Sequence, residues 1–284
     1  MKYIIHRNIR IPLIGFGTWM LGEDEKKEKE EIETLLRGIN EYDMTLIDTA
    51  EMYGYGKAEA LIGKLLKKVD RKKIYIIDKI LPENAINGRY LESCKASLKR
   101  LGVDYIDLYL LHWNEYGLDL GEMIQNMENL KMLGLIKNWG VSNFDTHEME
   151  ELFSYPDGDK CFLNQCLYNL ERRQCEYDLL DWCKRHDVLF MAYSPLLNNK
   201  DDKNKLLNSE AFNFALKLSS RSLESLLLSF VIRKEDVITA FKTSNVTHLK
   251  SNLENVFAPI PKETLTILDK EFPSPKEKEY IKYI

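Results

Sequence analysis

Four side chains capable of acid–base chemistry stand at or just beyond the ends of short apolar runs: Asp48, Tyr53, Lys79 and His112. Parallel α/β folds keep their chemistry at the carboxyl ends of buried strands, so these residues are candidates for one cleft. A buried lysine and a buried aspartate on neighbouring strands must neutralise each other, and we infer that Asp48 and Lys79 pair. Taken singly, each residue also fits a structural role, as a loop cap, a packed tyrosine, a solvated lysine or a core histidine.

The pairing suggests a task for Tyr53. A free tyrosine has a pKa near 10, which is too high for ready proton exchange at neutral pH. An ammonium about 4 Å away, at an effective dielectric of roughly 20, favours the phenolate by about 4 kcal/mol, or about three pKa units. We therefore expect Lys79 to lower the pKa of Tyr53 and to make it a usable general acid. His112 could orient a carbonyl or help to relay the proton.

The elements that must position these groups alternate between strand and helix along the whole chain, which is typical of βαβ units. A hairpin is expected at residues 3–6 and 9–11. Eight strands are expected at 13–16, 44–47, 74–78, 105–111, 135–141, 161–163, 188–192 and 237–240. Helices are expected at 23–39, 57–66, 89–101, 120–133, 174–186, 209–218, 223–232 and 245–256, with a helix-like tail beyond residue 257.

Eight such units without a linker predict one α/β domain over residues 1–284, a (β/α)₈ TIM barrel with an N-terminal β-hairpin. An open doubly wound sheet is the alternative, but the glycine turn after the first strand lacks the G-x-G-x-x-G pattern. Side-chain alternation places Ile77 and Lys79 on one face of their strand, and Leu108, Leu110 and His112 on one face of theirs, all pointing inward.

Composition excludes several classes of function. The 284 residues are 44% hydrophobic and 30% charged, with 40 basic and 45 acidic side chains interspersed and a net charge of −5. This balance gives no electrostatic case for nucleic acid or for an acidic membrane. No apolar run approaches the roughly 20 residues of a membrane helix, and no signal peptide is evident, so we expect a cytoplasmic protein. Five cysteines without a C-x-x-C pair suggest reduced structural thiols, and no metal ligands are assigned.

Several motifs occur in a fixed order: GFGTW at 15–19, the block at 48–63, SLKRLGVDYIDLYLLHW at 97–113, WGVSNF at 139–144, NQCLYNLERR at 164–173 and AYSPL at 192–196. Together they resemble the aldo-keto reductase family over nearly the whole chain. The resemblance implies a barrel that binds a nicotinamide dinucleotide without a Rossmann domain and transfers hydride to an aldehyde or ketone. It also implies a catalytic tetrad of Asp48, Tyr53, Lys79 and His112, with Tyr53 as the proton donor.

The resemblance further assigns the cofactor contacts. Ser142, Asn143 and Gln165 match positions that hydrogen-bond the nicotinamide carboxamide, and Tyr193 matches the aromatic residue that stacks on the ring. The full implied set is Gly17, Thr18, Trp19, Asp48, Ser142, Asn143, Gln165, Tyr193, Ser194, Leu196, Lys242, Thr243, Ser244, Asn245, His248 and Asn252.

The segment from Lys242 to Asn245 follows the eighth expected strand and opens a helix. A lysine, two hydroxyls and free backbone amides there can hold the 2′-phosphate of NADP. Two departures from the family pattern matter: Ala240-Phe241 replace a common Ile-Pro, and His248 stands where an arginine often contacts phosphate. Neutral histidine binds phosphate more weakly than a guanidinium group does. We expect NADPH, with NADH as the alternative.

The expected partner is a small-molecule carbonyl compound. Trp19, Met52, Tyr53, Trp113 and Phe144 would form an apolar, aromatic mouth. The assigned substrate-binding residues are Trp19, Tyr53, His112 and Trp113. No long lid is evident, so we expect an open site with broad carbonyl specificity.

Two other classes of function stay open: a non-catalytic dinucleotide-binding regulatory subunit on the same fold, and a Schiff-base lyase or aldolase that uses Lys79. A monomer is expected because no large apolar helix face is left unassigned.

Overall fold

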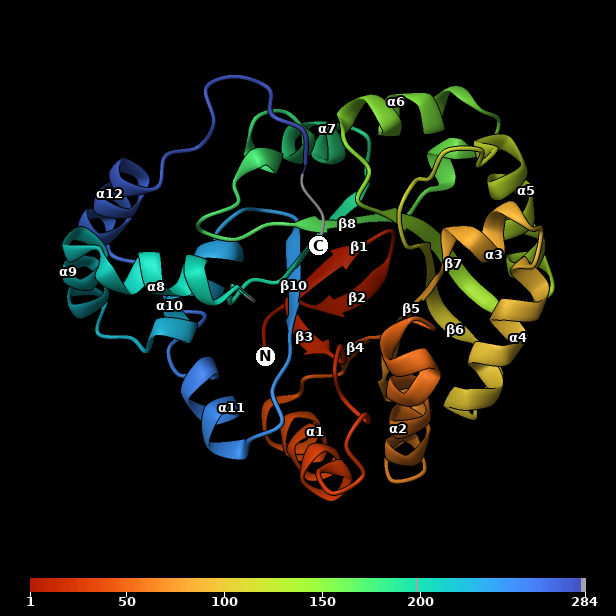
Figure 1. The fold of residues 1–284 in the computed structure, drawn as a ribbon, viewed down its shortest axis with the longest axis horizontal. Coiled ribbons are helices and arrows are strands. Elements are labelled where there is room, and N and C mark those ends of the chain that lie inside the picture. Colours follow the sequence, from red (N-terminus) through yellow and green to blue (C-terminus); the bar gives the residue numbers. More distant parts are fainter. Residues whose placement is uncertain (198, 282–284) are drawn as a thin grey trace.

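Eight parallel strands close into a barrel in the computed structural model, which describes residues 1–197 and 199–281 (Figure 1). Around the ring the order is β10-β3-β4-β5-β6-β7-β8-β9, so the strands follow the chain and the sheet closes between β10 and β3. The strands are β3 (Ile14–Gly17), β4 (Leu46–Asp48), β5 (Tyr75–Ile80), β6 (Ile106–Leu111), β7 (Ile136–Ser142), β8 (Leu163–Leu167), β9 (Leu189–Tyr193) and β10 (Val237–Phe241). The predicted barrel is confirmed, and closure of the sheet excludes the doubly wound alternative.

Helices surround this barrel (Figure 1). They are α1 (Glu28–Tyr42), α2 (Lys57–Leu66), α3 (Pro82–Ile86), α4 (Tyr90–Leu101), α5 (Leu120–Met132), α6 (Thr146–Ser154), α7 (Leu179–Arg185), α8 (Lys200–Asn208), α9 (Glu210–Ser219), α10 (Leu223–Val231), α11 (Val246–Leu253) and α12 (Lys262–Glu271). Short 3₁₀ turns are η1 (Tyr53–Gly56), η2 (Arg71–Lys73), η3 (Gly158–Lys160) and η4 (Gln174–Glu176). Helices α3, α6 and α8 were not predicted, and the helix expected over 174–186 is divided into η4 and α7.

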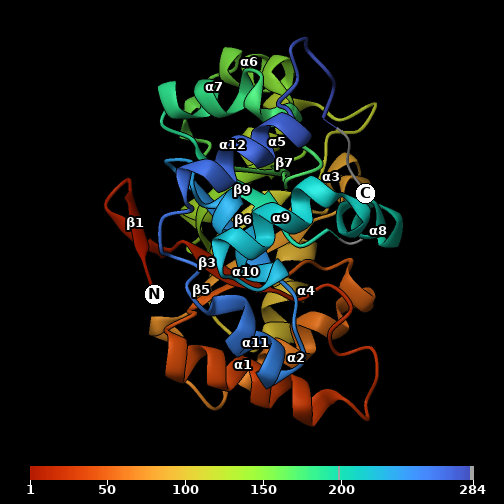
Figure 2. The ribbon, with the colours of Figure 1, turned by 90° about the vertical axis from the view of Figure 1, so that its left-hand side faces the viewer.

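The N-terminal hairpin is formed by β1 (Tyr3–His6) and β2 (Ile9–Pro12), as predicted. Its two turn residues, Arg7 and Asn8, have φ values of 45° and 64°, as a tight hairpin turn requires. The Arg7 guanidinium donates to the backbone oxygens of Lys160 (3.1 Å) and Asp187 (2.8 Å), which ties the hairpin to the barrel. Figure 2 shows the hairpin and α8 at opposite ends of the molecule. The hairpin packs against the inner core at its own end of the barrel, so a ligand site is expected at the end beside α8.

Side-chain alternation along the strands separates an inner core from an outer one. Ile77, Leu108 and Leu110 belong to the cluster inside the barrel, whereas Tyr109 packs with the residues under the helices. Lys79 is fully buried and follows Ile77 at an interval of two, as the alternation predicts.

The bounds of the sixth strand were wrong. Residues 161–163 were predicted, with Asn164 taken as a strand end, but β8 runs from Leu163 to Leu167. The Asn164 amide is buried and donates to the Phe144 backbone oxygen (2.8 Å), so a polar residue sits inside the strand with its hydrogen bond satisfied.

Candidate active site

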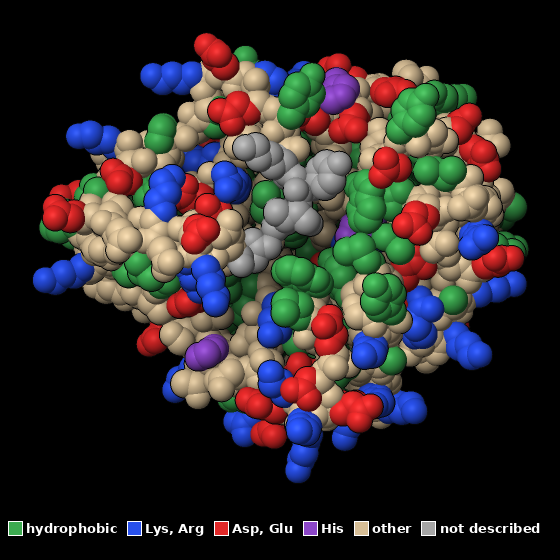
Figure 3. Space-filling view, viewed as in Figure 1, with side chains coloured by type: hydrophobic (Ala, Val, Ile, Leu, Met, Phe, Trp, Pro, Cys, Tyr) green, Lys and Arg blue, Asp and Glu red, His purple; other side chains and the backbone are tan. Residues whose placement is uncertain are grey.

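A cavity of about 690 Å³ lies at the carboxyl ends of the barrel strands. Figure 3 shows this face hollowed near its centre, with hydrophobic side chains gathered around the hollow. The predicted residues that line the cavity are Gly17, Thr18, Trp19, Asp48, Met52, Tyr53, His112, Trp113, Ser142, Asn143, Gln165, Tyr193, Ser194, Leu196 and Lys242. The barrel therefore brings together most of the residues that the sequence singled out.

Lys79 lies beneath the cavity and binds three oxygens. Its Nζ atom donates to Asp48 Oδ1 at 2.7 Å, to the Thr49 backbone oxygen at 2.9 Å and to the Tyr53 hydroxyl at 3.2 Å. Asp48 Oδ1 also accepts from the Gln165 side-chain amide at 2.8 Å. The inferred pairing of Asp48 with Lys79 is confirmed, and Asp48 and Tyr53 both line the cavity, whereas Lys79 does not.

Burial, rather than the neighbouring ammonium, has the largest effect on Tyr53. Burial raises the pKa of the phenol, Lys79 lowers it, and the net pKa lies above the ordinary value of 10.0. The expected lowering was wrong because the Coulomb estimate left out the desolvation of the phenolate. Burial alone would lower the pKa of Lys79, but Asp48 and Tyr53 raise it above 10.5, so the ammonium persists.

His112 is held neutral. Burial, followed by the charge of Lys79, lowers its pKa to about 3. Its ring lies edge-on to that of Tyr53, with 5.9 Å between centroids, and no described residue hydrogen-bonds its buried Nδ1 atom. A neutral imidazole can donate or accept one hydrogen bond but carries no positive charge at neutral pH.

Because His112 is neutral in the folded protein, the free energy of unfolding is expected to decrease in acid. Between the unfolded-state pKa of 6.5 and the folded-state pKa of about 3, the unfolded chain binds a proton that the folded chain does not. Stability therefore falls as the pH falls through this window. Between pH about 7 and about 5 the wild type should lose about 2 kcal/mol more than His112→Gln, measured by urea unfolding. If the wild type and His112→Gln lost the same amount of stability over this pH range, His112 could not be the neutral group described here.

Hydrogen bonds connect the amide and hydroxyl groups expected at the nicotinamide. The Ser142 hydroxyl donates to the Gln165 backbone oxygen at 2.7 Å, and the Asn143 amide donates to the His112 backbone oxygen at 3.0 Å. The Tyr193 hydroxyl donates to Asn143 Oδ1 at 2.9 Å. These bonds fix the orientation of each group before any ligand arrives.

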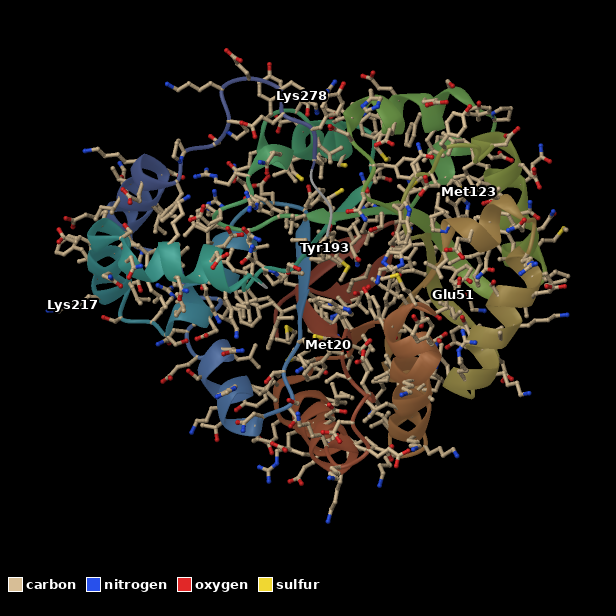
Figure 4. The ribbon with its side chains drawn as sticks, viewed as in Figure 1. Met20, Glu51, Met123, Tyr193, Lys217 and Lys278 are labelled. Atoms are coloured by element: carbon tan, nitrogen blue, oxygen red, sulfur yellow. The ribbon has the colours of Figure 1, made fainter. Side chains whose placement is uncertain are left out.

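Several loops at this end adopt the left-handed conformation. Met20, Asn143, Ser194 and Leu197 have φ values of 65°, 62°, 52° and 58°, and all four line the cavity. Such conformations are costly for bulky side chains and gather at functional sites. Figure 4 places Met20 and Tyr193 near the middle of the face.

The segment expected to bind the cofactor phosphate differs from its prediction. Asn245 caps α11, and its Oδ1 accepts from the backbone amides of Thr247 (2.8 Å) and His248 (3.1 Å). These two amides were expected to be free to bind phosphate, but the Asn245 side chain already accepts their hydrogen bonds. Lys242 lines the cavity, whereas the other predicted residues of this segment, Thr243, Ser244, Asn245, His248 and Asn252, lie outside its lining.

The cavity wall differs from the prediction at one aromatic residue and contains six residues that were not predicted. Phe144 is fully buried in the outer core and does not line the cavity. The lining residues that were not predicted are Met20, Pro195, Leu197, Lys203, Ala240 and Phe241. Lys203 belongs to α8, which follows β9 and was not predicted, so this helix adds a residue to the cavity wall. Asn199 caps α8 through its side chain, and this capping residue was the available signal.

Among the described residues, no helix is long and apolar enough to cross a bilayer. All five cysteines are buried free thiols.

The chain is similar to known proteins in both sequence and fold. The Aldo/keto reductase family model matches residues 13–271. Methylglyoxal reductase YeaE of Escherichia coli K12 is 40% identical over 271 residues, which is 95% of this chain and 94% of that protein. The crystal structure of an aldo-keto reductase from Klebsiella pneumoniae in complex with NADPH has a TM-score of 0.92 and 35% identity, covering 99% of this chain and 98% of that one. An NADH-specific methylglyoxal reductase of E. coli K12 is 31% identical over 219 residues, 66% of this chain and 65% of that protein.

The family model, the YeaE relative and the Klebsiella pneumoniae structure each match nearly the whole chain. The chain belongs to the aldo/keto reductase family, a family of oxidoreductases.

Proposed function

We propose that the protein reduces small aldehydes and ketones to alcohols with NADPH, and that Tyr53 donates the proton. The observation that carries this proposal is the Tyr53 hydroxyl at the edge of the cavity, 3.2 Å from the buried Lys79 ammonium. An acid and its charged partner are thus aimed at the place where a carbonyl oxygen can enter.

The chemistry of the cavity wall suits a nicotinamide dinucleotide. Ser142, Asn143 and Gln165 offer a hydroxyl and two amides to a carboxamide, and Tyr193 offers an aromatic ring to its flat face. Lys203 and Lys242 bring positive charge to the lining, as phosphate groups require. When bound, NADPH supplies the hydride. A solved relative holds NADPH, which supports this choice, while the NADH-specific relative keeps NADH as the alternative.

Tyr53 is protonated at neutral pH because even the ordinary phenol pKa of 10.0 lies well above 7, and burial raises it further, so the acid is present in the required form. As negative charge develops on the carbonyl oxygen, Tyr53 gives up its proton, and Lys79 at 3.2 Å stabilises the resulting phenolate. Asp48 and the Thr49 backbone oxygen hold the Lys79 ammonium in position throughout.

His112 is best suited to orienting the substrate. Because its low pKa keeps the imidazole neutral, it can hydrogen-bond a carbonyl oxygen without competing with Tyr53 as the acid. Trp19, Met52 and Trp113 surround the approach with apolar surface. Small 2-oxoaldehydes fit this description, and methylglyoxal is the first substrate to test because the relatives include methylglyoxal reductases.

The test is a titration with NADPH and NADH followed by tryptophan fluorescence, then turnover of methylglyoxal and a panel of small carbonyls. We expect tighter binding of NADPH and oxidation of bound NADPH when carbonyl is added. Binding without turnover over the panel would favour a regulatory subunit. Borohydride trapping of a substrate on Lys79 would favour Schiff-base chemistry and would overturn the proposal.

A further inference from the structure

A second buried carboxyl group lies next to Lys79 in the chain. Asp78 precedes Lys79 on β5, so its side chain points out of the barrel, toward the helices. It is fully buried, and its Oδ1 atom accepts from the Lys79 backbone amide at 2.8 Å. The other oxygen, Oδ2, is buried and receives no hydrogen bond from the described residues.

A second fully buried carboxyl, that of Glu59 on α2, acts on Asp78. Two ionised carboxylates offer only acceptors, so they can hydrogen-bond each other only through a proton. Arg100 occupies both oxygens of Glu59, with Nε 2.5 Å from Oε2 and Nη2 3.0 Å from Oε1. The ionised member is therefore Glu59, and the proton belongs to Asp78.

The charges around Asp78 lead to the same assignment. The titratable and charged groups that act on it are Glu59 on α2, Cys94 and Arg100 on α4, Lys79 on β5, Tyr109 on β6 and Tyr53 in η1. Arg100 is engaged by Glu59, and Lys79 by Asp48. If Asp78 were ionised as well as Asp48 and Glu59, it would be a third anion without a cation to pair with. A buried carboxylate without a counter-ion takes up a proton instead. In agreement, burial and then Glu59 raise the pKa of Asp78 well above its usual range.

The same cluster touches the turn that carries Tyr53. Gly56 ends this turn with a φ of 87°, and a Cβ atom on it would lie 2.6 Å from Arg100 Cδ. Only glycine accepts this backbone conformation and this approach at once. The Glu59–Arg100 pair therefore packs against Gly56 at the end of η1, the turn that begins at Tyr53.

We propose that Asp78 is a positioning residue, held as an uncharged carboxylic acid by a proton shared with Glu59. In this state it fixes the backbone amide of Lys79 and leaves Asp48 as the counter-ion of the ammonium. An ionised Asp78 would add a second negative charge behind Lys79 and would make Tyr53 a weaker acid. The effect on catalysis rests on the proposed reductase function, whereas the protonated state does not.

Two measurements on the full chain test the proposal. An infrared difference spectrum between wild type and Asp78→Asn at neutral pH should contain the carbonyl band of a protonated carboxylic acid, because every other carboxyl group cancels. In Glu59→Gln, the new amide can donate to Asp78 and ionise it. The basic limb of the pH profile of kcat, with NADPH and methylglyoxal, should then move up by on the order of one pH unit.

The double variant Glu59→Gln/Asp78→Asn is the matched control, and it should return the basic limb to its wild-type position. A shift that persists in the double variant, or a difference spectrum without the acid band, overturns the proposal. If Glu59→Gln does not fold, the infrared spectrum of Asp78→Asn still decides the protonation state. The two proposals can fail separately. If the wild-type protein shows the acid band but reduces no carbonyl compound, the reductase function is refuted, whereas the shared proton is not.

Discussion

We expect Tyr53→Phe to lower kcat for carbonyl reduction by about 10²–10⁴-fold, the usual contribution of a positioned general acid. The substitution removes the hydroxyl that lies 3.2 Å from Lys79 Nζ but leaves the ring in the cavity wall. Lys79 keeps its bonds to Asp48 and to the Thr49 backbone oxygen, so the fold should survive. Steady-state kinetics with methylglyoxal measure the loss, and NADPH titration should show unchanged cofactor affinity.

Tyr55 provides the matched control. It lies two residues further along the same turn, is 98% exposed and does not line the cavity. Tyr55→Phe should therefore turn over like the wild type. Near-normal activity in Tyr53→Phe would remove Tyr53 from the role of proton donor, whatever the control shows.

The second large effect concerns stability. Asp48→Ala should lower the free energy of unfolding by about 3–5 kcal/mol, because it leaves the buried Lys79 ammonium without its anion. Removing the charge as well, in Asp48→Ala/Lys79→Met, should recover most of this loss, since two uncharged groups need no counter-ion. Urea unfolding monitored by circular dichroism measures both differences.

A surface ion pair of similar length shows whether burial is the cause. Lys184 and Glu235 are 2.6 Å apart and both are largely exposed, so Glu235→Ala should change stability little. The explanation from burial would be wrong if Asp48→Ala were as mild as Glu235→Ala, or if Lys79→Met failed to rescue it.

Local patterns in the sequence were enough to identify the barrel and the residues at its strand ends. The alternation of apolar residues along β5 and β6 placed Lys79 and His112 inside, because neighbouring side chains of a strand point to opposite faces. The pairing of Asp48 with Lys79 followed from the cost of burying either charge alone. Local signals were also overlooked: Asp145 and Glu148 form a capping box at the start of α6, a pattern visible in the sequence.

Other features depend on distances between residues far apart in the chain, and only the tertiary structure decided them. The direction of the Tyr53 pKa shift depends on how deeply the barrel buries the phenol, which no spacing along the chain reveals. The position of Lys203 in the cavity wall depends on where α8 packs, and the raised pKa of Asp78 on β5 depends on burial and on Glu59 arriving from α2. The sequence by itself determined which groups could do chemistry, because residue type and strand parity are local. The fold decided their protonation states, because desolvation and charge pairing are set by neighbours that only folding brings together.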